Sequence, residues 1–192
     1  MENTYWISVM NVIKTKIAGL LLIEPKVYGD ARGYFFESFQ QDRYQEIGIQ
    51  GPFVQDNVSR SRQYVLRGLH HQKEQTQGKL VYVTRGSIFD VAVDIRQDSE
   101  TFGQWFGAIL DDQTHRQLYI PEGCAHGFCV LSDEVDFIYK CTNYYHPKSE
   151  LSIRWDDPSI GIDWPIETPI LSEKDQNGRL LNEIPKDELP LL

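Results

Sequence analysis

Residues 87–96 read Ser-Ile-Phe-Asp-Val-Ala-Val-Asp-Ile-Arg, and this stretch decides the class of fold. Every second residue from Phe89 to Ile95 is large and apolar, whereas the positions between them hold small or acidic residues such as Asp90. Alternation with a period of two predicts a β-strand whose two faces differ in character. The β-rich residues 79–84 come just before it, and the turn signal between the two stretches predicts that they are joined directly.

Short segments of the same kind recur along the chain and are separated by turn residues. Helix is scarce: we expect a short one over residues 42–47 and another turn or two within 173–181. Many short strands at this spacing predict an all-β sandwich or barrel with a few short helices, not an alternating β/α fold. Besides 87–96, we expect strands over residues 20–23, 34–38, 53–59, 64–69, 79–84, 104–110, 117–120, 127–131, 136–144 and 152–155.

No boundary between domains is visible in the sequence. It has no Pro/Ser-rich linker, no internal repeat and no low-complexity segment, so we expect a single domain over residues 1–192. Met10 is a second plausible start, and residues 1–9 are interpreted as a possible N-terminal extension. Residues 166–192 have little periodicity and several prolines, which predicts an irregular tail, and such a tail can deliver a side chain to a site built on strands.

Composition excludes some classes of function. The formal net charge is −9, which argues against a nucleic-acid-binding protein because such proteins need a basic face. Cys124, Cys129 and Cys141 are odd in number and lack zinc-type spacing, so we expect reduced packing residues and a cytoplasmic protein. No apolar run approaches the ~20 residues of a membrane helix, and the N-terminus lacks the positive region of a signal peptide.

Basic and titratable side chains gather in the stretch Arg-Gly-Leu-His-His-Gln, residues 67–72. In a regular strand His70 and His71 point to opposite faces, so we expect only one of them inside the sandwich or barrel, with Arg67 on the face of His71. Alternation alone does not say which histidine points inward. Histidine titrates near neutral pH, which suits a general base, although a single histidine is more often structural.

A metal site is the main alternative for these histidines, but the pattern does not favour one. A facial metal site needs about three ligands, and adjacent histidines in a strand cannot face the same ion. The other histidines, His115, His126 and His146, form no His-x-His pair, so we expect no metal. A Gly-rich phosphate loop, a nucleophile elbow and a dinucleotide fingerprint are also missing, which leaves proton transfer and electrostatic stabilisation as the expected chemistry.

Nine sequence blocks, in order and with compatible spacing, resemble one family. The blocks that carry the resemblance are GDARGYFFE (29–37), QDNVSRS (55–61), VLRGLH (65–70), QGKLV (77–81), FDVAVDIR (89–96), IPEGCAHGF (120–128), YKCTNYY (139–145), GIDWP (161–165) and LSEKD (171–175). With these blocks, the chain from Met10 to about Pro185 resembles the dTDP-4-dehydrorhamnose 3,5-epimerases.

The resemblance implies a jelly-roll β-sandwich of the cupin type that works without a metal or other cofactor. It also implies a homodimer that exchanges N-terminal strands. The family substrate is dTDP-4-dehydro-6-deoxy-D-glucose, whose C4 ketone acidifies the hydrogens at C3 and C5. Inversion of both carbons gives dTDP-4-dehydro-L-rhamnose on the route to dTDP-L-rhamnose, and it requires a base, a group that stabilises the enolate oxygen and an acid on the opposite side.

The same resemblance implies a role for each matching residue. His70 is implied as the base, Asp175 as the carboxylate that orients it, Lys79 as the cation facing the C4 oxygen and Tyr139 as the acid. By residue type alone, Asp175 would be a solvated tail residue, Lys79 a surface lysine and Tyr139 a packed aromatic residue. The remaining matches are expected to bind substrate: Arg32, Glu37, Gln55, Asn57, Arg67, His126, Tyr145, Glu150 and Lys174.

Among these binding residues, Arg32 and Arg67 are expected at the pyrophosphate or sugar, because a guanidinium matches phosphate oxygens. Tyr145 is expected to stack on thymine. If strands are exchanged, Arg32 and Glu37 would serve the partner's pocket. Three other functions remain open: a mono-epimerase of a related deoxysugar, a sugar-nucleotide-binding module without catalysis, and a metal-dependent cupin enzyme.

Overall fold

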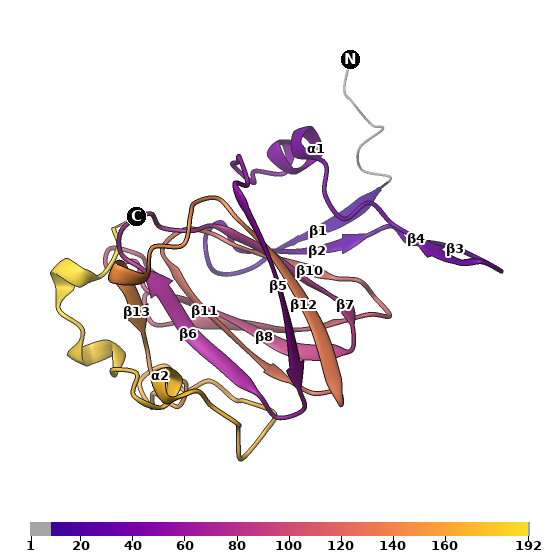
Figure 1. The fold of residues 1–192 in the computed structure, drawn as a ribbon. Coiled ribbons are helices and arrows are strands. Elements are labelled where there is room, and N and C mark those ends of the chain that lie inside the picture. Colours follow the sequence, from indigo (N-terminus) through magenta and orange to yellow (C-terminus); the bar gives the residue numbers. More distant parts are fainter. Residues whose placement is uncertain (1–8, 192) are drawn as a thin grey trace.

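The computed structural model describes residues 9–191, and two antiparallel β-sheets face each other in it (Figure 1). The larger sheet has six strands in the order β1-β2-β10-β7-β12-β5. Its strands are β1 (Met10–Lys14), β2 (Leu21–Pro25), β10 (Gln117–Ile120), β7 (Lys79–Arg85), β12 (Glu134–Cys141) and β5 (Gln55–Arg62).

The smaller sheet has five strands in the order β13-β6-β11-β8-β9. They are β13 (Glu150–Ser152), β6 (Leu66–Gln72), β11 (Cys124–Val130), β8 (Ser87–Asp94) and β9 (Trp105–Asp111). Strands that follow one another in sequence, such as β5 and β6 or β7 and β8, often lie in different sheets. The fold is a cupin-like jelly roll, which confirms the all-β prediction and decides between the sandwich and the barrel that alternation left open.

The interior of the sandwich is apolar at one end and polar at the other. Residues from both sheets form the apolar core, among them Val81, Leu118, Phe128 and Phe137, all less than 5% exposed. Burial of side chains of this size stabilises the fold by about 1.5–3 kcal/mol each. The polar end holds the candidate site. Packing at the apolar end fixes the distance between the two sheets at this site.

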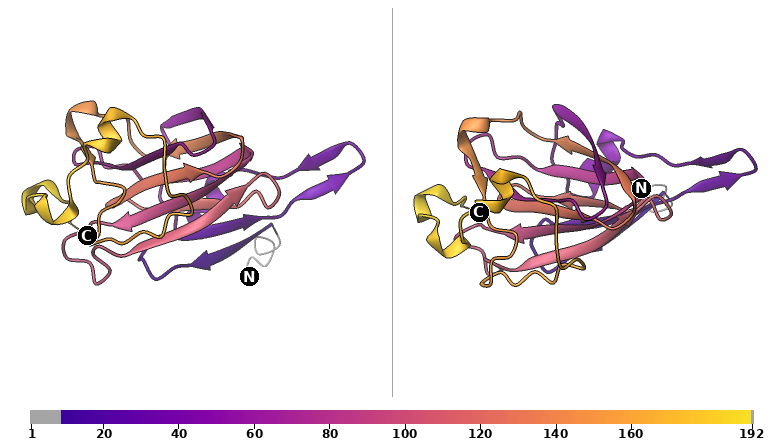
Figure 2. Two further views of the ribbon diagram at one scale, coloured as in Figure 1. Left: turned by 90° about the horizontal axis from the view of Figure 1, so that it is seen from below. Right: turned by 60° about the horizontal axis from the view of Figure 1, so that its bottom comes forward.

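The outer face of the six-stranded sheet carries a smaller core. Helix α1 (Gln41–Glu46) and the segment that follows it cover this face, and Tyr44 is buried with Ile23 and Ile49. The short hairpin of β3 (Tyr28–Asp30) and β4 (Gly33–Phe35) instead projects away from both sheets, as Figures 1 and 2 show.

The apolar face of β8 points away from the sandwich interior. Val91 and Val93 pack beneath the C-terminal tail, which crosses the outer face of the five-stranded sheet (Figure 2). The tail covers them with Leu181, Ile184 and Leu189, all buried. It contains helix α2 (Glu173–Gln176) and the 3-10 turns η3 (Leu181–Glu183) and η4 (Lys186–Glu188), and η2 (Pro147–Ser149) precedes β13. The other face of β8 carries Asp90 into the interior.

Most expected strands are present with ends shifted by a few residues. β1 and β3 lie outside the expected strands, and the strand expected at 34–38 is only β4. The helix expected at 42–47 and a short helix within 173–181 are confirmed. The proposed extension, residues 1–9, lies almost wholly outside the described residues, and the single domain stays a prediction. None of the described helices is long and apolar enough to cross a membrane.

Candidate active site

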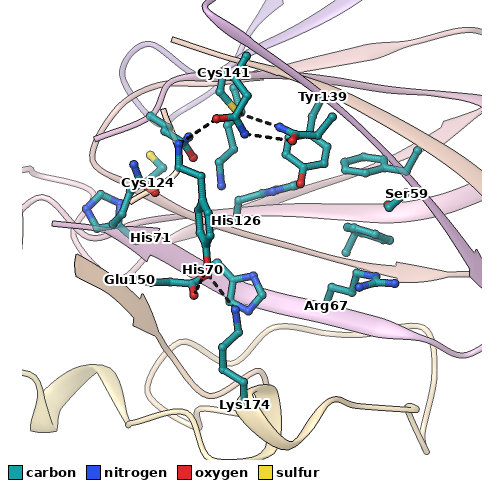
Figure 3. Close-up of a pocket in the computed structure, with 18 residues that line it drawn as sticks. Ser59, Arg67, His70, His71, Cys124, His126, Tyr139, Cys141, Glu150 and Lys174 are labelled. Atoms are coloured by element: carbon teal, nitrogen blue, oxygen red, sulfur yellow. Dashed lines mark hydrogen bonds and ion pairs between the residues drawn. The ribbon is translucent and has the colours of Figure 1, made fainter. Parts of the chain in front are cut away.

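A cavity of about 330 Å³ opens between the two sheets at the polar end of the sandwich (Figure 3). Its size falls in the range of about 300–1,000 Å³ usual for small-molecule sites. It brings together ten of the predicted site residues from both sheets and the tail: Gln55, Asn57, Arg67, His70, Lys79, His126, Tyr139, Tyr145, Glu150 and Lys174.

The six-stranded sheet supplies one wall through neighbouring strands in register. Lys79 on β7 lies opposite Cys141 on β12, which in turn lies opposite Gln55 on β5. Two residues before Cys141 on β12, Tyr139 lies opposite Asn57 on β5. Because residues that pair directly across an antiparallel ladder share a face, these side chains all point into the cavity.

The five-stranded sheet supplies the facing wall, and an irregularity places two of its residues there. Between His126 and Phe128 the register of β11 against β6 shifts, so His70 pairs with His126 while Arg67 pairs with Phe128. Arg67 and His70 therefore both reach the cavity although they are three residues apart. The expectation that Arg67 and His70 lie on opposite faces is wrong, because strict alternation fails at a bulge.

The adjacent histidine corrects a second expectation. His71 is 5% exposed and also borders the cavity, beside Cys124 (Figure 3), so both histidines of the pair reach it. Burial lowers the pKa of His71 to about 4, with Lys79 adding to the effect. His71 is therefore uncharged at neutral pH.

Helix α2 places a carboxylate directly behind His70. Nε2 of His70 lies 2.6 Å from Oδ1 of Asp175, and Asp175 is only 3% exposed. Two parallel bridges hold the chain on either side of the helix, Val65 with Ile170 and Ile153 with Arg179. The tail is thus fixed to the sheet both before and after Asp175.

The environment of Asp175 keeps it ionised. Burial alone would raise its pKa, but hydrogen bonds from His70 and Ser172 outweigh this and hold the pKa below its ordinary value. A carboxylate in this position fixes the orientation of the imidazole and stabilises the imidazolium that forms when His70 takes a proton.

Burial shifts the pKa values of Tyr139 and Lys79 in opposite directions. Burial raises the pKa of Tyr139, so its phenol keeps its proton at neutral pH. Burial lowers the pKa of Lys79, while Cys141 and Asp90 oppose the shift. Within residues 9–191 no carboxylate forms an ion pair with Lys79, which leaves its ammonium free to face a ligand oxygen.

A second imidazole–carboxylate pair lies deeper in the cavity. Nε2 of His126 is 2.9 Å from Oδ2 of Asp90, and both side chains are buried. Burial lowers the pKa of His126 and raises that of Asp90, so burial works against charge on either partner. Asp90 is not among the predicted site residues, although its position between the apolar residues of β8 marks the inward face.

The mouth of the cavity holds an aromatic side chain that polar contacts keep in place. Oε1 of Glu150 accepts from Nζ of Lys174 at 2.8 Å, and Oε2 accepts from the hydroxyl of Tyr145 at 3.0 Å. The backbone N–H of Tyr145 donates to the Gln55 side chain at 2.9 Å. Tyr145 remains 53% exposed, so its ring is held at the rim with a face available for stacking.

Three predicted residues do not line this cavity: Asp175, which lies behind His70, and two residues farther away, Arg32 and Glu37. Arg32 is at the tip of the β3–β4 hairpin, where its side chain is 90% exposed and pairs with Asp30. Glu37 pairs with Arg43 at 2.7 Å. Neither borders the cavity of its own chain, which is the arrangement expected if both serve another copy.

Several lining residues were not predicted, and alternation could have found most of them. Counting by twos from Asn57, Tyr139 and His126 reaches lining residues on the same strands: Ser59, Phe137, Cys141, Cys124 and Phe128. Gln72 lies two residues after His70 on β6, and Gln77 lies two residues before Lys79, just ahead of β7, so the same count reaches them. All three cysteines are free and buried, and two of them border the cavity. No group of three or more His, Cys, Asp or Glu within residues 9–191 is arranged to hold a metal ion.

The fold and the cavity first define a class. An imidazole–carboxylate pair, a half-buried lysine and a protonated phenol inside a jelly roll are the parts of an acid–base enzyme of the cupin type. Comparison with known proteins then identifies the family. The family model described as dTDP-4-dehydrorhamnose 3,5-epimerase matches residues 14–183, and the chain belongs to this family of isomerases.

Similar proteins come from distant organisms. The chain is 56% identical over 176 residues to a dTDP-4-dehydrorhamnose 3,5-epimerase of Methanothermobacter thermautotrophicus, covering 90% of this chain and 95% of that protein. It is 56% identical over 172 residues to the enzyme of Shigella flexneri, covering 88% and 95%. A Legionella pneumophila epimerase in complex with dTDP-4-keto-L-rhamnose superposes with a TM-score of 0.93 at 59% identity, covering 95% and 98%.

Proposed function

We propose that this protein inverts C3 and C5 of dTDP-4-dehydro-6-deoxy-D-glucose to give dTDP-4-dehydro-L-rhamnose. The observation that carries the proposal is the placement of His70, backed by Asp175, and Tyr139 on opposite walls of one cavity. Inversion needs a base on one side of the sugar ring and an acid on the other. Binding alone would not require such a pair.

His70 is the base of the proposed mechanism. It removes the proton from the carbon next to the C4 ketone, and the charge that develops passes to the C4 oxygen as an enolate. Asp175 stabilises the resulting imidazolium at a distance of 2.6 Å. Lys79 supports the oxygen charge from the six-stranded sheet, where partial burial strengthens its electrostatic effect.

Tyr139 is the acid of the proposed mechanism. Its phenol is protonated at neutral pH and lies on the wall opposite His70, so it can return a proton to the other face of the carbon. The aromatic neighbour Phe137, 5.4 Å away between ring centroids, limits the movement of the ring. His126, Asn57 and Arg67 are proposed to contact the sugar and the pyrophosphate.

The nucleotide is proposed to lie at the rim. Tyr145 stacks on thymine, while Glu150 and Lys174 hold the tyrosine and close that side of the cavity. Gln55 adds a polar contact from β5. No cofactor is assigned a role, because these residues supply the base, the acid and the charge stabilisation that the reaction needs.

A homodimer with exchanged N-terminal strands completes the proposed site. The β3–β4 hairpin exposes 49% of Tyr28, 55% of Tyr34 and 68% of Phe35, an apolar surface that association would cover. In such a dimer Arg32 and Glu37 reach the partner's pocket. Free, buried cysteines are consistent with the cytoplasm as the proposed location.

Isotope exchange tests the proposed reaction. The protein is incubated with substrate in heavy water, and we expect deuterium at both C3 and C5 together with inversion of both centres. Exchange at one carbon only would identify a mono-epimerase, and exchange at neither carbon would leave a binding module. Replacing His70 tests the assignment of the base.

For His70→Ala we expect turnover to fall by about 10²–10⁴-fold, the usual contribution of a positioned base, with dTDP binding unchanged. His146→Ala is the matched control, because His146 lies outside the cavity and bonds Ser149. Full activity of the His70 variant would refute its role.

A further inference from the structure

The hydroxyl of Ser172 occupies a special position next to the carboxylate behind His70. Ser172 precedes α2 and its Oγ donates to Oδ2 of Asp175 at 2.7 Å. The other carboxylate oxygen, Oδ1, faces Nε2 of His70 at 2.6 Å. Each oxygen of Asp175 therefore has its own side-chain partner, one in the cavity wall and one in the tail.

Two hydrogen-bond partners fix the plane of the Asp175 carboxylate, which a single partner would leave free to rotate. The torsion that rotates an aspartate carboxylate about its last bond has a broad energy profile, so a single hydrogen bond does not define the plane of the group. With Ser172 on Oδ2 and His70 on Oδ1, the plane is set from both ends. The backbone N–H of Gly68 adds a further hydrogen bond to the same carboxylate.

We propose that Ser172 is a positioning residue for the epimerisation: its hydroxyl holds the Asp175 carboxylate in the orientation that keeps His70 aligned as the base. The inference rests on the proposed function of His70 and Asp175. Ser172 does not border the cavity, so it acts through Asp175 and not on the substrate.

The Ser172 hydroxyl also makes a second contact, which is purely structural. The experiment must separate the effect of this contact from the effect on His70. Ser172 is the N-cap of α2, and its Oγ accepts the backbone N–H of Asp175 at 3.2 Å. Loss of a cap by substitution with alanine typically costs about 0.5–2 kcal/mol, whereas glycine at this position costs only a few tenths. Ser172→Gly therefore keeps most of the capping preference and removes the hydroxyl without adding a charge.

The test compares Ser172→Ala, Ser172→Gly and Ser172→Thr with the wild type, using kcat, KM and exchange at C3 and C5. We expect kcat to fall on the order of tenfold in the alanine and glycine variants, the effect of losing one hydrogen bond to a charged group. KM and dTDP affinity should stay unchanged, because the contact acts on the base. The threonine variant keeps the hydroxyl and should retain activity.

Glu173→Ala is the matched control, an exposed neighbour in α2 that should keep wild-type kcat. Wild-type kcat in Ser172→Gly would overturn the proposal, as would a loss in Ser172→Thr equal to that in Ser172→Ala. The wild-type measurement separates the two hypotheses. Absence of exchange there refutes the proposed function, whereas an active wild type with active Ser172 variants refutes only the role of Ser172.

Discussion

At the scale of single residues, the candidate base depends on a partner far away in the sequence. His70 and Asp175 are separated by 105 positions and meet at 2.6 Å. His70 is partly exposed to the cavity, while Asp175 is almost fully buried behind it. A buried carboxylate with hydrogen bonds to both oxygens stabilises the folded chain only while it is charged, which makes its contribution dependent on pH.

Asp175→Asn should reveal this dependence. Because hydrogen bonds from His70 and Ser172 outweigh burial and depress the pKa of Asp175, its ionisation stabilises the fold above the unfolded pKa of about 3.9. This stabilisation disappears as pH falls through the lower pKa of the folded state. We expect the variant to be about 1 kcal/mol less stable from pH 7 to pH 5 and the gap to shrink toward pH 3, as measured by urea unfolding.

The exposed neighbour Glu173 provides the comparison for this experiment. Glu173→Gln removes a charge from the same helix without touching His70, so its unfolding free energy should match the wild type at each pH. A stability gap for Asp175→Asn that widens toward pH 3 would contradict the assignment of a charged, hydrogen-bonded carboxylate.

At the scale of elements, the short helix α2 depends on how the tail is fastened. Only four residues long, α2 has little stability of its own, because isolated short helices are marginal in water. The bridge of Ile153 with Arg179 anchors the chain just after it. Gly178 allows this approach: a Cβ there would lie 2.8 Å from the backbone nitrogen of Arg154.

Gly178→Ala should therefore disturb the site from outside it. The added methyl group meets backbone atoms that cannot move aside easily, and we expect a loss of about 1–3 kcal/mol in unfolding free energy. Activity should fall as well, because the displaced tail carries Asp175. Thermal unfolding and kcat measure the two effects. Gln176→Ala, an exposed change in α2, should alter neither, and a fully active Gly178→Ala enzyme would show that α2 is positioned independently of this anchor.

At the scale of the whole molecule, contacts within one chain do not account for the position of the β3–β4 hairpin. The hairpin projects away from both sheets (Figure 1), and Arg32 at its tip is not among the residues that line the cavity of its own chain. At the base of the hairpin, the ring of Phe36 stacks on His115 at 4.6 Å between centroids, and the ring of Tyr34 contacts His115 at 4.4 Å in a tilted arrangement. The hairpin is thus held at its base while its tip is free to reach another molecule.

Mixed dimers test this arrangement. Arg32→Ala and His70→Ala are each expected to be weakly active or inactive alone. If Arg32 serves the partner's pocket, mixing the two by joint refolding should restore activity to about a quarter of wild type, because half of the dimers are mixed and each has one intact site. If Arg32 serves its own pocket, or if the protein is monomeric by light scattering, no activity returns.

The sequence by itself determined the strand content and most of the candidate site. Alternation in residues such as those of β8 is a local property, because successive side chains in a strand must point to opposite faces. It therefore predicted an all-β fold without tertiary information. The family blocks added residues from distant segments, and ten of the predicted site residues border one cavity.

The tertiary structure decided the features that depend on what lies opposite a strand. The register shift of β11 against β6 puts Arg67 and His70 on the same side, which alternation forbids. The tail covers the apolar face of β8 and leaves the face with Asp90 to the site. Asp175 lies behind His70 because the tail is fastened to the sheet on either side of α2. These contacts join residues far apart in the chain, so no local pattern encodes them.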